Sequence, residues 1–314
     1  MAVSFPVSGP EPLGPGVGPP QPAPEGGLAI EARRGIWKAI AQTFLENRLA
    51  VVGTGIIVFM VLFCFLGPVF WSTNQVTTNF AISNQPPDPA HPLGTTAAGY
   101  DVLGRLMLGG QSSLELGFAV AIMTTCIGTL WGAFAGFVGG VVDAVMMRIV
   151  DALLSIPVLV LLLILVNIFT PNLGLLIVIL SLLAWLVPAR LVRGETLTLR
   201  VREYVQAVRV MGGRRWRIVG RHIIPNAISV IVVNASFQVA DAILIVANLS
   251  FLGLGIPPPH ASWGDILSNG LNYLSDGYWW LVYPAGIAIV LTVVAFVFIG
   301  NALRDSLDVR LQQR

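Results

Sequence analysis

The segment that decides the fold is residues 152–189, ALLSIPVLVLLLILVNIFTPNLGLLIVILSLLAWLVPA, which carries no charged side chain. A helix that crosses a bilayer needs about 20 predominantly apolar residues, so this segment is long enough to cross twice. Thr170, Pro171 and Asn172 lie near its middle, and a cluster of this kind favours a turn. The segment therefore predicts two transmembrane helices joined at that turn.

The rest of the chain has the same character. Only 11% of its 314 residues are charged and 55% are hydrophobic, whereas soluble domains contain about 25% charged residues. Four further windows are long and apolar, and only the one that contains Asp241 is interrupted by a charge. They are residues 49–70, 116–138, 223–248 and 277–303. The sequence thus predicts an all-α integral membrane protein with six transmembrane helices.

The basic residues fix the expected orientation. With the N-terminus inside, every one of the 18 Lys and Arg residues except Arg105 falls in a segment on the inner side. Because basic residues are enriched in the cytoplasmic segments of membrane proteins, both termini are predicted to be cytoplasmic. The aromatic residues Trp71, Trp279 and Trp280 then fall at the outer interface, where such side chains are common.

The two ends of the chain are predicted to lie outside the bilayer core. Residues 1–29 are rich in Pro and Gly, so they are expected to form a disordered cytoplasmic tail. Residues 30–48 alternate apolar and basic side chains at helical spacing, which favours an amphipathic elbow helix on the inner surface. A plain extension of the first span is the alternative. Residues 304–314 are expected to be a second cytoplasmic tail.

The longest inner loop has an unusual pattern. Residues 190–221 are crowded with arginines and contain only Glu195 and Glu203 as acids. Good helix formers on both sides of Gly212 and Gly213 predict two short helices joined by a glycine turn. The positive-inside rule explains the charge but not the pattern, and nucleic-acid binding is disfavoured because no aromatic platform is interleaved. A compact knob of this kind suits mechanical contact with a partner protein.

The knob carries a recognisable motif. Gln206-Ala207-Val208, Gly212 and Ile224-Pro225 resemble the EAA loop of ABC importer permeases, which reads E-A-A, three residues, G, nine residues and I-x-L-P. Gln206 stands where the family has Glu. The resemblance implies that residues 194–224 form a coupling loop that inserts into a groove of an ATP-binding subunit. The coupling residues that it implies are Glu203, Gln206, Ala207, Gly212, Arg214, Arg215, Ile224 and Pro225.

Two further stretches extend this resemblance. Residues 250–264, SFLGLGIPPPHASWG, are similar to the S-F-L-G-L-G-V-Q-P-P-x-P-S-W-G signature of the second permease of dipeptide, oligopeptide and nickel importers. Residues 91–103, HPLGTTAAGYDVL, resemble that family's H-P-x-G-T-D-x-x-G-R-D-V box, with Thr96 and Tyr100 in place of Asp and Arg. A type I ABC importer permease fold is implied. Its parts would be a first transmembrane helix with an extracytoplasmic loop (residues 49–110) and a five-helix core (residues 111–303).

The resemblance also implies partners and a location. It predicts a permease subunit of an ATP-driven importer of di- or oligopeptides in a bacterial cell membrane. A companion permease, two ATP-binding subunits and an extracytoplasmic substrate-binding protein would complete the importer. Nickel, glutathione and haem remain open as cargo.

The chain itself offers no catalytic machinery. It has no P-loop of the form G-x-x-x-x-G-K-[ST], so ATP and Mg²⁺ are expected on the partner subunits and no cofactor on this chain. Its two cysteines, Cys64 and Cys126, lie in apolar runs and do not suggest a metal site. A membrane-embedded enzyme is disfavoured because no HExxH or GxSxG motif occurs.

Polar residues in the spans are the candidates for the transport path. Asn234, Gln238 and Asp241 recur at i, i+4 and i+7 and share one helix face, and a charge at mid-membrane costs about 2.5–3.5 kcal/mol on insertion scales. They are predicted to line the path, with Asn167 as a weaker candidate. A polar contact between helices, or a position of Asp241 at the outer interface, is the alternative. A proton-coupled secondary carrier that uses Asp241 is the competing function, disfavoured because no internal repeat of spans is visible.

Small residues mark an expected helix contact. Gly128, Gly132, Gly136 and Gly140 recur every four residues, and small residues at that spacing allow helices to approach closely in a membrane. The partner helix is predicted to come either from this chain or from the companion permease.

Overall fold

The computed structural model describes residues 41–169, 172–256 and 260–312. Within these ranges the regular structure is helical, apart from an isolated bridge between Thr95 and Asp101. The predicted all-α class is therefore confirmed. The predicted tail, residues 1–29, and most of the predicted elbow helix lie outside the described residues, although residues 41–46 are helical.

Four helices are long and apolar enough to cross a membrane unaided: α2 (Arg48–Phe70), α3 (Val102–Val138), α10 (Ile228–Phe251) and α12 (Tyr283–Gln312). The first begins where the Asn47 side chain accepts hydrogen bonds from the backbone N–H groups of Leu49 and Ala50, as expected of an N-cap. The long α3 starts at Asp101 in the same way, with Gly104 donating to its carboxylate.

Two pairs of bent helices are candidates for further crossings. The helices α4 (Gly140–Leu154) and α5 (Val158–Ile168) meet at 78°, and α6 (Leu173–Ala184) and α7 (Leu186–Leu199) meet at 41°. Up to six spans result if each bent pair counts as one, in agreement with the predicted number.

The boundaries of these two spans differ from the prediction. The third begins at Gly140, ahead of the charge-free window, and the fourth continues past Ala189 to Leu199. The charge-free window gave the wrong ends for these spans because α4 and α7 carry opposite charges that pair with each other. Arg193 binds Asp143 and Arg190 binds Asp151, so a helix-helix contact tolerates side chains that a window in a single chain segment excludes.

The last span is also longer than its window. Two 3₁₀ turns, Leu274–Asp276 and Trp279–Leu281, precede α12 at Tyr283, and α12 then continues to Gln312. Most of the predicted cytoplasmic tail, residues 304–314, is therefore a continuation of the helix.

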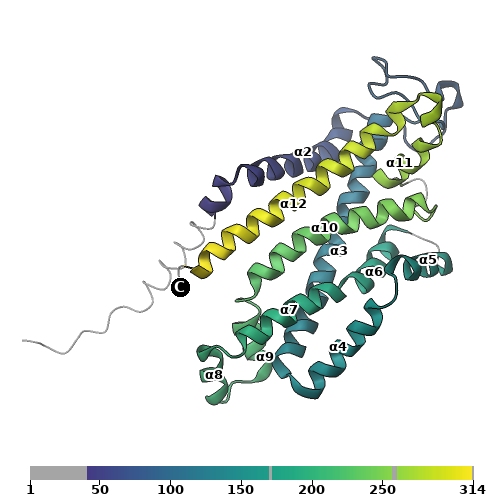
Figure 1. Cartoon of the computed structure of the whole chain (residues 1–314). Helices are drawn as coiled ribbons and strands as arrows, with labels where there is room; N and C mark the ends of the chain where they lie inside the picture. The colour runs from purple at the N-terminus through teal and green to yellow at the C-terminus, as the bar shows by residue number, and fades with distance from the viewer. Residues whose placement is uncertain (1–40, 170–171, 257–259, 313–314) are drawn as a thin grey trace, which may run out of the picture.

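The helices form one elongated bundle (Figure 1). The first span α2 lies beside α12, α10 packs against both α12 and α3, and α3 packs along α7. The short helices α8 (Glu203–Val210) and α9 (Arg215–Ile218) lie at one end. The helix α11 (Trp263–Leu271) and the loop between α2 and α3 lie at the opposite end (Figure 1). These are called the knob end and the loop end below.

Apolar side chains fill the interior and also cover much of the exterior. A cluster from α2, α3, α10, α11 and α12 surrounds the fully buried Trp263, whose indole N–H donates to the Leu106 carbonyl at 2.9 Å. On the outside, α2 exposes Phe59, Leu62 and Leu66. Backbone groups of a helix are satisfied internally, so an apolar exterior of this kind is stable in lipid.

Candidate functional site

The arginine-rich loop folds as the sequence predicts. The arginine knob, residues 200–226, consists of α8, a turn at Gly212, the short α9, a π-turn at Val219–Ile223 and the lead into α10. The turn closes through bonds from the Gly212 N–H to the Arg209 carbonyl at 3.1 Å and from the Gly213 N–H to the Val208 carbonyl at 3.0 Å.

The two glycines of this turn have different roles. Gly212 has φ = +80°, a conformation that favours glycine, yet a Cβ atom there would meet nothing within 4 Å. At Gly213 a Cβ would lie 2.8 Å from both the Cγ1 and the carbonyl oxygen of Val208. Gly212 is thus required for its backbone angle and Gly213 for space.

The knob has its own small core. Val205 of α8, Ile218 of α9 and Ile223 of the π-turn are buried against Ala133 and Phe137 of α3. Trp216 adds a stacked contact with the Phe134 ring of α3, with centroids 4.9 Å apart. The knob is therefore a rigid extension of α3 and α7 rather than a loose loop.

Two hydrogen bonds close the joint between the knob and the bundle. The Gln206 side chain donates to the Arg200 carbonyl at the end of α7 at 2.9 Å, and the Arg200 guanidinium donates to the Gly136 carbonyl of α3 at 2.8 Å. A cation near the last carbonyls of a helix also interacts favourably with the helix dipole. Gln206 is exposed, and its amide nitrogen bonds back to the end of α7.

The outer surface of the knob combines apolar and basic side chains. Val210 and Met211 are 86% and 76% exposed at its tip. Of the remaining predicted coupling residues, Ile224 is half-buried against the knob core. The others are exposed: Glu203, Ala207, Arg214, Arg215 and Pro225.

The four glycines spaced every four residues, called the glycine stripe below, explain how closely α7 packs against α3. They are Gly128, Gly132, Gly136 and Gly140. A Cβ at Gly128 would lie 2.5 Å from Pro188 Cβ, one at Gly132 would lie 2.2 Å from the Ala189 carbonyl oxygen, and one at Gly136 would lie 2.9 Å from Thr196 Cβ. These three glycines let the backbones approach within this chain. Gly140 differs from the predicted role, because it follows the end of α3, has φ = +59° and faces open space.

Charge pairs hold α4 against α7. The Arg193 guanidinium binds Asp143 with two bonds, Nε to Oδ1 at 2.5 Å and the second nitrogen to Oδ2 at 2.7 Å. Arg190 binds Asp151 in the same interface but at an exposed position. The ion pairs thus fix α7, which leads into the knob, to α4.

The polar residues of α10 divide into two groups. Gln238 is buried and donates to the Ala184 carbonyl of α6 at 3.2 Å, which makes it a contact between helices. Asp241 is exposed near the middle of α10, and Asn234 is half-buried with an Oδ1 atom that has no partner among the described residues. Asn167 on α5 is exposed and donates to the Leu163 carbonyl of its own helix.

One residue of this face was missed by the sequence reasoning. Asn248 is exposed one heptad beyond Asp241, so Asn234, Asp241 and Asn248 recur every seven residues. Two helical turns separate successive members, which places them on one helix face that is exposed at Asp241 and Asn248 and half-buried at Asn234. This set is called the α10 polar stripe. A search at seven-residue spacing would have found it.

The residues 250–264 signature builds the joint between α10 and α11. α10 ends at Phe251, and Gly253 with φ = +76° follows, where its N–H bonds the Ser250 carbonyl at 3.0 Å. Ser262 and Asp265 then form a capping box that starts α11. Residues 257–259 of the signature lie outside the described residues.

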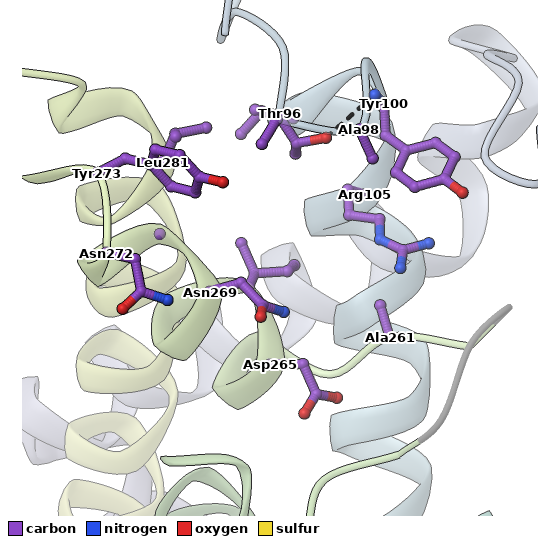
Figure 2. A pocket seen from close by; sticks show the side chains of 14 residues that line it. Thr96, Ala98, Tyr100, Arg105, Ala261, Asp265, Asn269, Asn272, Tyr273 and Leu281 are labelled. Atoms are coloured by element: carbon purple, nitrogen blue, oxygen red, sulfur yellow. Dashed lines mark hydrogen bonds between the residues drawn. The ribbon is translucent and has the colours of Figure 1, made fainter. Parts of the chain in front are cut away.

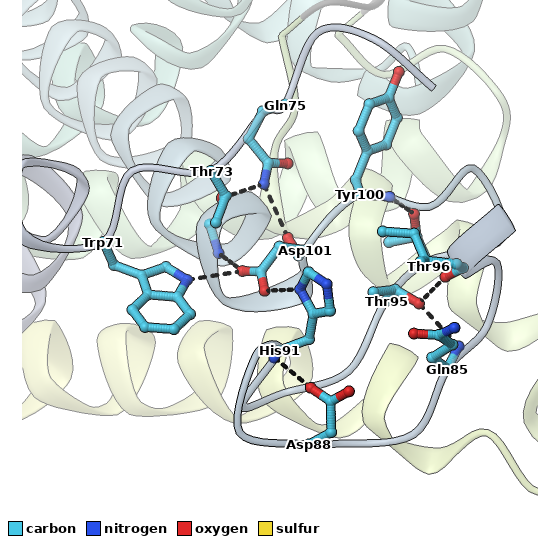
Figure 3. A network of polar contacts seen from close by, with 12 residues as sticks. Trp71, Thr73, Gln75, Gln85, Asp88, His91, Thr95, Thr96, Tyr100 and Asp101 are labelled. Atoms are coloured by element: carbon cyan, nitrogen blue, oxygen red, sulfur yellow. Dashed lines mark hydrogen bonds and ion pairs between the residues drawn. The ribbon is translucent and has the colours of Figure 1, made fainter. Parts of the chain in front are cut away.

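The loop end is organised around the buried Asp101 (Figure 3). Its carboxylate accepts hydrogen bonds from the Gly104 N–H at 2.7 Å and the Trp71 indole N–H at 3.3 Å, and it pairs with His91 Nδ1 at 2.9 Å. The HPLGT box thus caps α3 and ties the loop to α2. Thr96, which replaces a family Asp, accepts from the Tyr100 N–H at 3.1 Å.

A cavity of about 290 Å³ opens beside this network, between the loop, α3 and α11 (Figure 2). Arg105 lines it with its guanidinium 4.8 Å from the centre of the Tyr100 ring. Asp265 and Asn269 of α11 line the opposite wall. The loop end therefore presents a recess of the size of a side chain or a short loop tip, with polar and apolar side chains in its lining.

The described residues include no group of three or more His, Cys, Asp or Glu side chains that could hold a metal ion.

Comparison with known proteins finds two family profiles that match this chain. The profile of a family described as "Binding-protein-dependent transport system inner membrane component" matches residues 128–313. A second profile, "N-terminal TM domain of oligopeptide transport permease C", matches residues 35–87. Together the two profiles cover the knob, the α10 stripe and the first span.

Curated relatives cover most of the chain. It is 38% identical over 278 residues to the oligopeptide transport system permease protein OppC of Bacillus subtilis, with 88% of this chain and 91% of the relative covered. It is 40% identical over 283 residues to OppC of Escherichia coli, with 90% and 93% covered. It is 36% identical over 268 residues to the dipeptide transport system permease protein DppC of B. subtilis, with 85% and 84% covered.

Proposed function

This chain belongs to the inner-membrane components of binding-protein-dependent transport systems, and from that premise we propose that it is the permease subunit of an ATP-driven importer of di- or oligopeptides. It is a multi-pass membrane protein with four unbroken and two bent candidate spans. ATP hydrolysis belongs to separate subunits, because the chain has no P-loop.

The observation that carries the proposal is the arginine knob. Its core is fixed to α3 and α7, while its tip exposes Val210 and Met211 beside Arg214 and Arg215. Exposed apolar groups rimmed by charge are typical of protein interfaces. A rigid knob transmits force, so a closing pair of ATP-binding subunits that grips it moves α3 and α7 as well.

The transport path runs along the α10 polar stripe. Asp241 and Asn248 are exposed and Asn234 is half-buried on the same helix face, and polar groups at that depth are stable only against water or a polar partner. The companion permease supplies the opposite wall. Alternating access then consists of tilting the bundle so that the stripe opens first toward the loop end and then toward the knob end.

The substrate-binding protein docks at the loop end. The recess between Tyr100, Arg105 and Asp265 receives a side chain or loop tip of that protein. In this topology the loop end is extracytoplasmic, and the knob and both termini are cytoplasmic, as the distribution of basic residues predicts.

The test uses the assembled importer in proteoliposomes, with the companion permease, the ATP-binding subunits and the binding protein. Peptide uptake is expected to require ATP and the binding protein and to be insensitive to a proton uncoupler. Uptake that needs a proton gradient but no ATP would overturn the proposal in favour of the carrier that uses Asp241.

A knob variant makes this test specific. Gly212→Val cannot adopt φ = +80° without strain, so the turn and the tip shift. We expect normal insertion, continued ATP hydrolysis and peptide uptake reduced at least tenfold. Gly194→Ala is the control, because a Cβ at Gly194 meets nothing within 4 Å, and it should transport normally. Normal uptake by Gly212→Val would count against the docking role of the knob.

A further inference from the structure

The break between α6 and α7 leaves one backbone carbonyl without its usual donor. In a continuous helix the N–H of residue 188 would bond the carbonyl of residue 184, but residue 188 is proline and has no N–H. The surrounding residues differ in burial: Leu186 is 4% exposed and Ala189 is fully buried, whereas Ala184 is half-buried and Val187 is exposed. The Ala184 carbonyl therefore needs a donor from elsewhere, because a backbone group without a partner is costly in a membrane-spanning segment.

Gln238 supplies that donor. Its Nε2 lies 3.2 Å from the Ala184 carbonyl oxygen, and the side chain reaches it from α10, 54 residues further along the chain. The Gln238 side chain is 7% exposed, and the hydrogen bond is partly buried. A buried side chain thus replaces the hydrogen bond that Pro188 removes.

The position of this bond connects two functional elements. On α10, Gln238 lies one turn from Asn234 and one turn from Asp241, both in the polar stripe. From Ala184 the chain continues through α7 directly into the arginine knob. In addition, Val192 and Leu199 of α7 pack in one apolar cluster with Ile231 of α10. Apolar contacts are non-directional, whereas a hydrogen bond fixes the rotation of one helix relative to the other.

We propose that Gln238 is a positioning residue that sets the rotation of α10 relative to the break between α6 and α7, so that movement of the arginine knob through α7 also moves the α10 polar stripe. The inference rests on the proposed function for its transport consequence. Its structural part, the link between Pro188 and Gln238 through the Ala184 carbonyl, is independent of the cargo.

The test is a double-mutant experiment on the assembled importer. Gln238→Leu removes the donor, and we expect the number of peptides transported per ATP hydrolysed to fall at least fivefold. Pro188→Ala provides a backbone N–H for the same carbonyl, so adding it to Gln238→Leu should recover at least half of the lost ratio. A loss of coupling that Pro188→Ala leaves unrepaired would overturn the assigned link.

The chain offers a matched control for general destabilisation. Gln111 on α3 makes an equivalent bond to the Cys64 carbonyl of α2 at 2.7 Å, away from both the stripe and α7. Gln111→Leu should lower thermal stability about as much as Gln238→Leu while leaving the ratio of peptide to ATP unchanged. An equal drop in the ratio for both variants would reduce Gln238 to a structural role and overturn the proposal.

A distance measurement separates this inference from the proposed function. Spin labels at Val187→Cys and Leu244→Cys, two exposed positions on α7 and α10, are placed in a Cys126→Ser background. The distance distribution should broaden in Gln238→Leu and narrow again when Pro188→Ala is added. An unchanged distribution overturns the inference even if transport is ATP-driven, and absence of peptide uptake by the wild type overturns the proposed function without touching the distance result.

Discussion

Each of the two broken spans contains a proline that removes a backbone N–H donor, and the two breaks differ in bend, in exposure and in the donors that their carbonyl groups find. Both breaks lie at a proline, Pro157 before α5 and Pro188 in the first turn of α7. The α4–α5 break bends by 78° and is solvent- or lipid-facing, with Ile156 41% exposed, whereas the α6–α7 break bends by 41° inside the bundle.

The carbonyl groups at the two breaks find different partners. At the first break they are satisfied locally: the Ser155 N–H donates to the Asp151 carbonyl at 3.1 Å and the Ile156 N–H to the Leu153 carbonyl at 3.3 Å. At the second break the Ala184 carbonyl depends on Gln238 of a distant helix. A locally satisfied break can change its angle freely, whereas a break satisfied from another helix moves only together with that helix. The buried break is therefore suited to transmit motion.

The largest expected effect comes from separating the buried break from α3. Gly132→Leu places a side chain where a Cβ would already lie 2.2 Å from the Ala189 carbonyl oxygen. We expect a loss of about 3 kcal/mol in the free energy of unfolding, at the upper end of the usual cost of overpacking. Denaturation in mixed micelles measures this loss. Gly194→Ala on the open side of α7 is the control, and similar stability of the two variants would contradict the close packing of α7 on α3.

An intermediate effect is expected from the ion pairs that join the arms of the two breaks. The side chain of Asp143 is 11% exposed and that of its partner Arg193 is 33% exposed, whereas Arg190 and Asp151 are about half exposed. Arg193→Ala leaves a buried carboxylate unpaired, so about 2 kcal/mol of unfolding free energy should be lost. Arg190→Ala should cost no more than about 1 kcal/mol. The reverse order in the same denaturation assay would show that the exposed pair carries the contact.

The smallest effect is expected at the exposed break. Pro157→Ala restores one N–H at a position where the neighbouring carbonyls already have local partners, so stability should change by less than about 1 kcal/mol. Peptide uptake should also be retained, in contrast to the loss expected for Gln238→Leu at the buried break. Loss of uptake by Pro157→Ala, measured in proteoliposomes, would remove the distinction between the two breaks.

The sequence predicts the architecture well for clear physical reasons. Composition and apolar windows establish a membrane bundle with six candidate crossings, because lipid excludes charge over the length of a helix. The turn at Gly212 can also be predicted from the sequence, because the tendency of glycine to break a helix is a local effect. Window boundaries fail at α4 and α7, where Asp143 and Arg193 neutralise each other across 50 residues of chain, a contact that local composition does not contain.

The roles of individual polar residues are harder to predict. Helical spacing correctly places Asn234, Gln238 and Asp241 near one another, but it gives no sign that Gln238 turns toward Ala184 while Asp241 stays exposed. That division depends on where α6 breaks and which helix packs there. In the same way, Gly140 continues the four-residue spacing of the glycine stripe in sequence but lies beyond the end of α3, where the chain turns.

The central claim is that the arginine knob contacts an ATP-binding subunit. The most direct measurement is cross-linking in native membranes of Ala207→Cys, in a Cys126→Ser background, to the ATP-binding subunits. The exposed Ser275→Cys at the loop end is the control. The account predicts a cross-linked product for Ala207→Cys and none for Ser275→Cys. No product for Ala207→Cys, together with its labelling in intact cells by a membrane-impermeant maleimide, would contradict it.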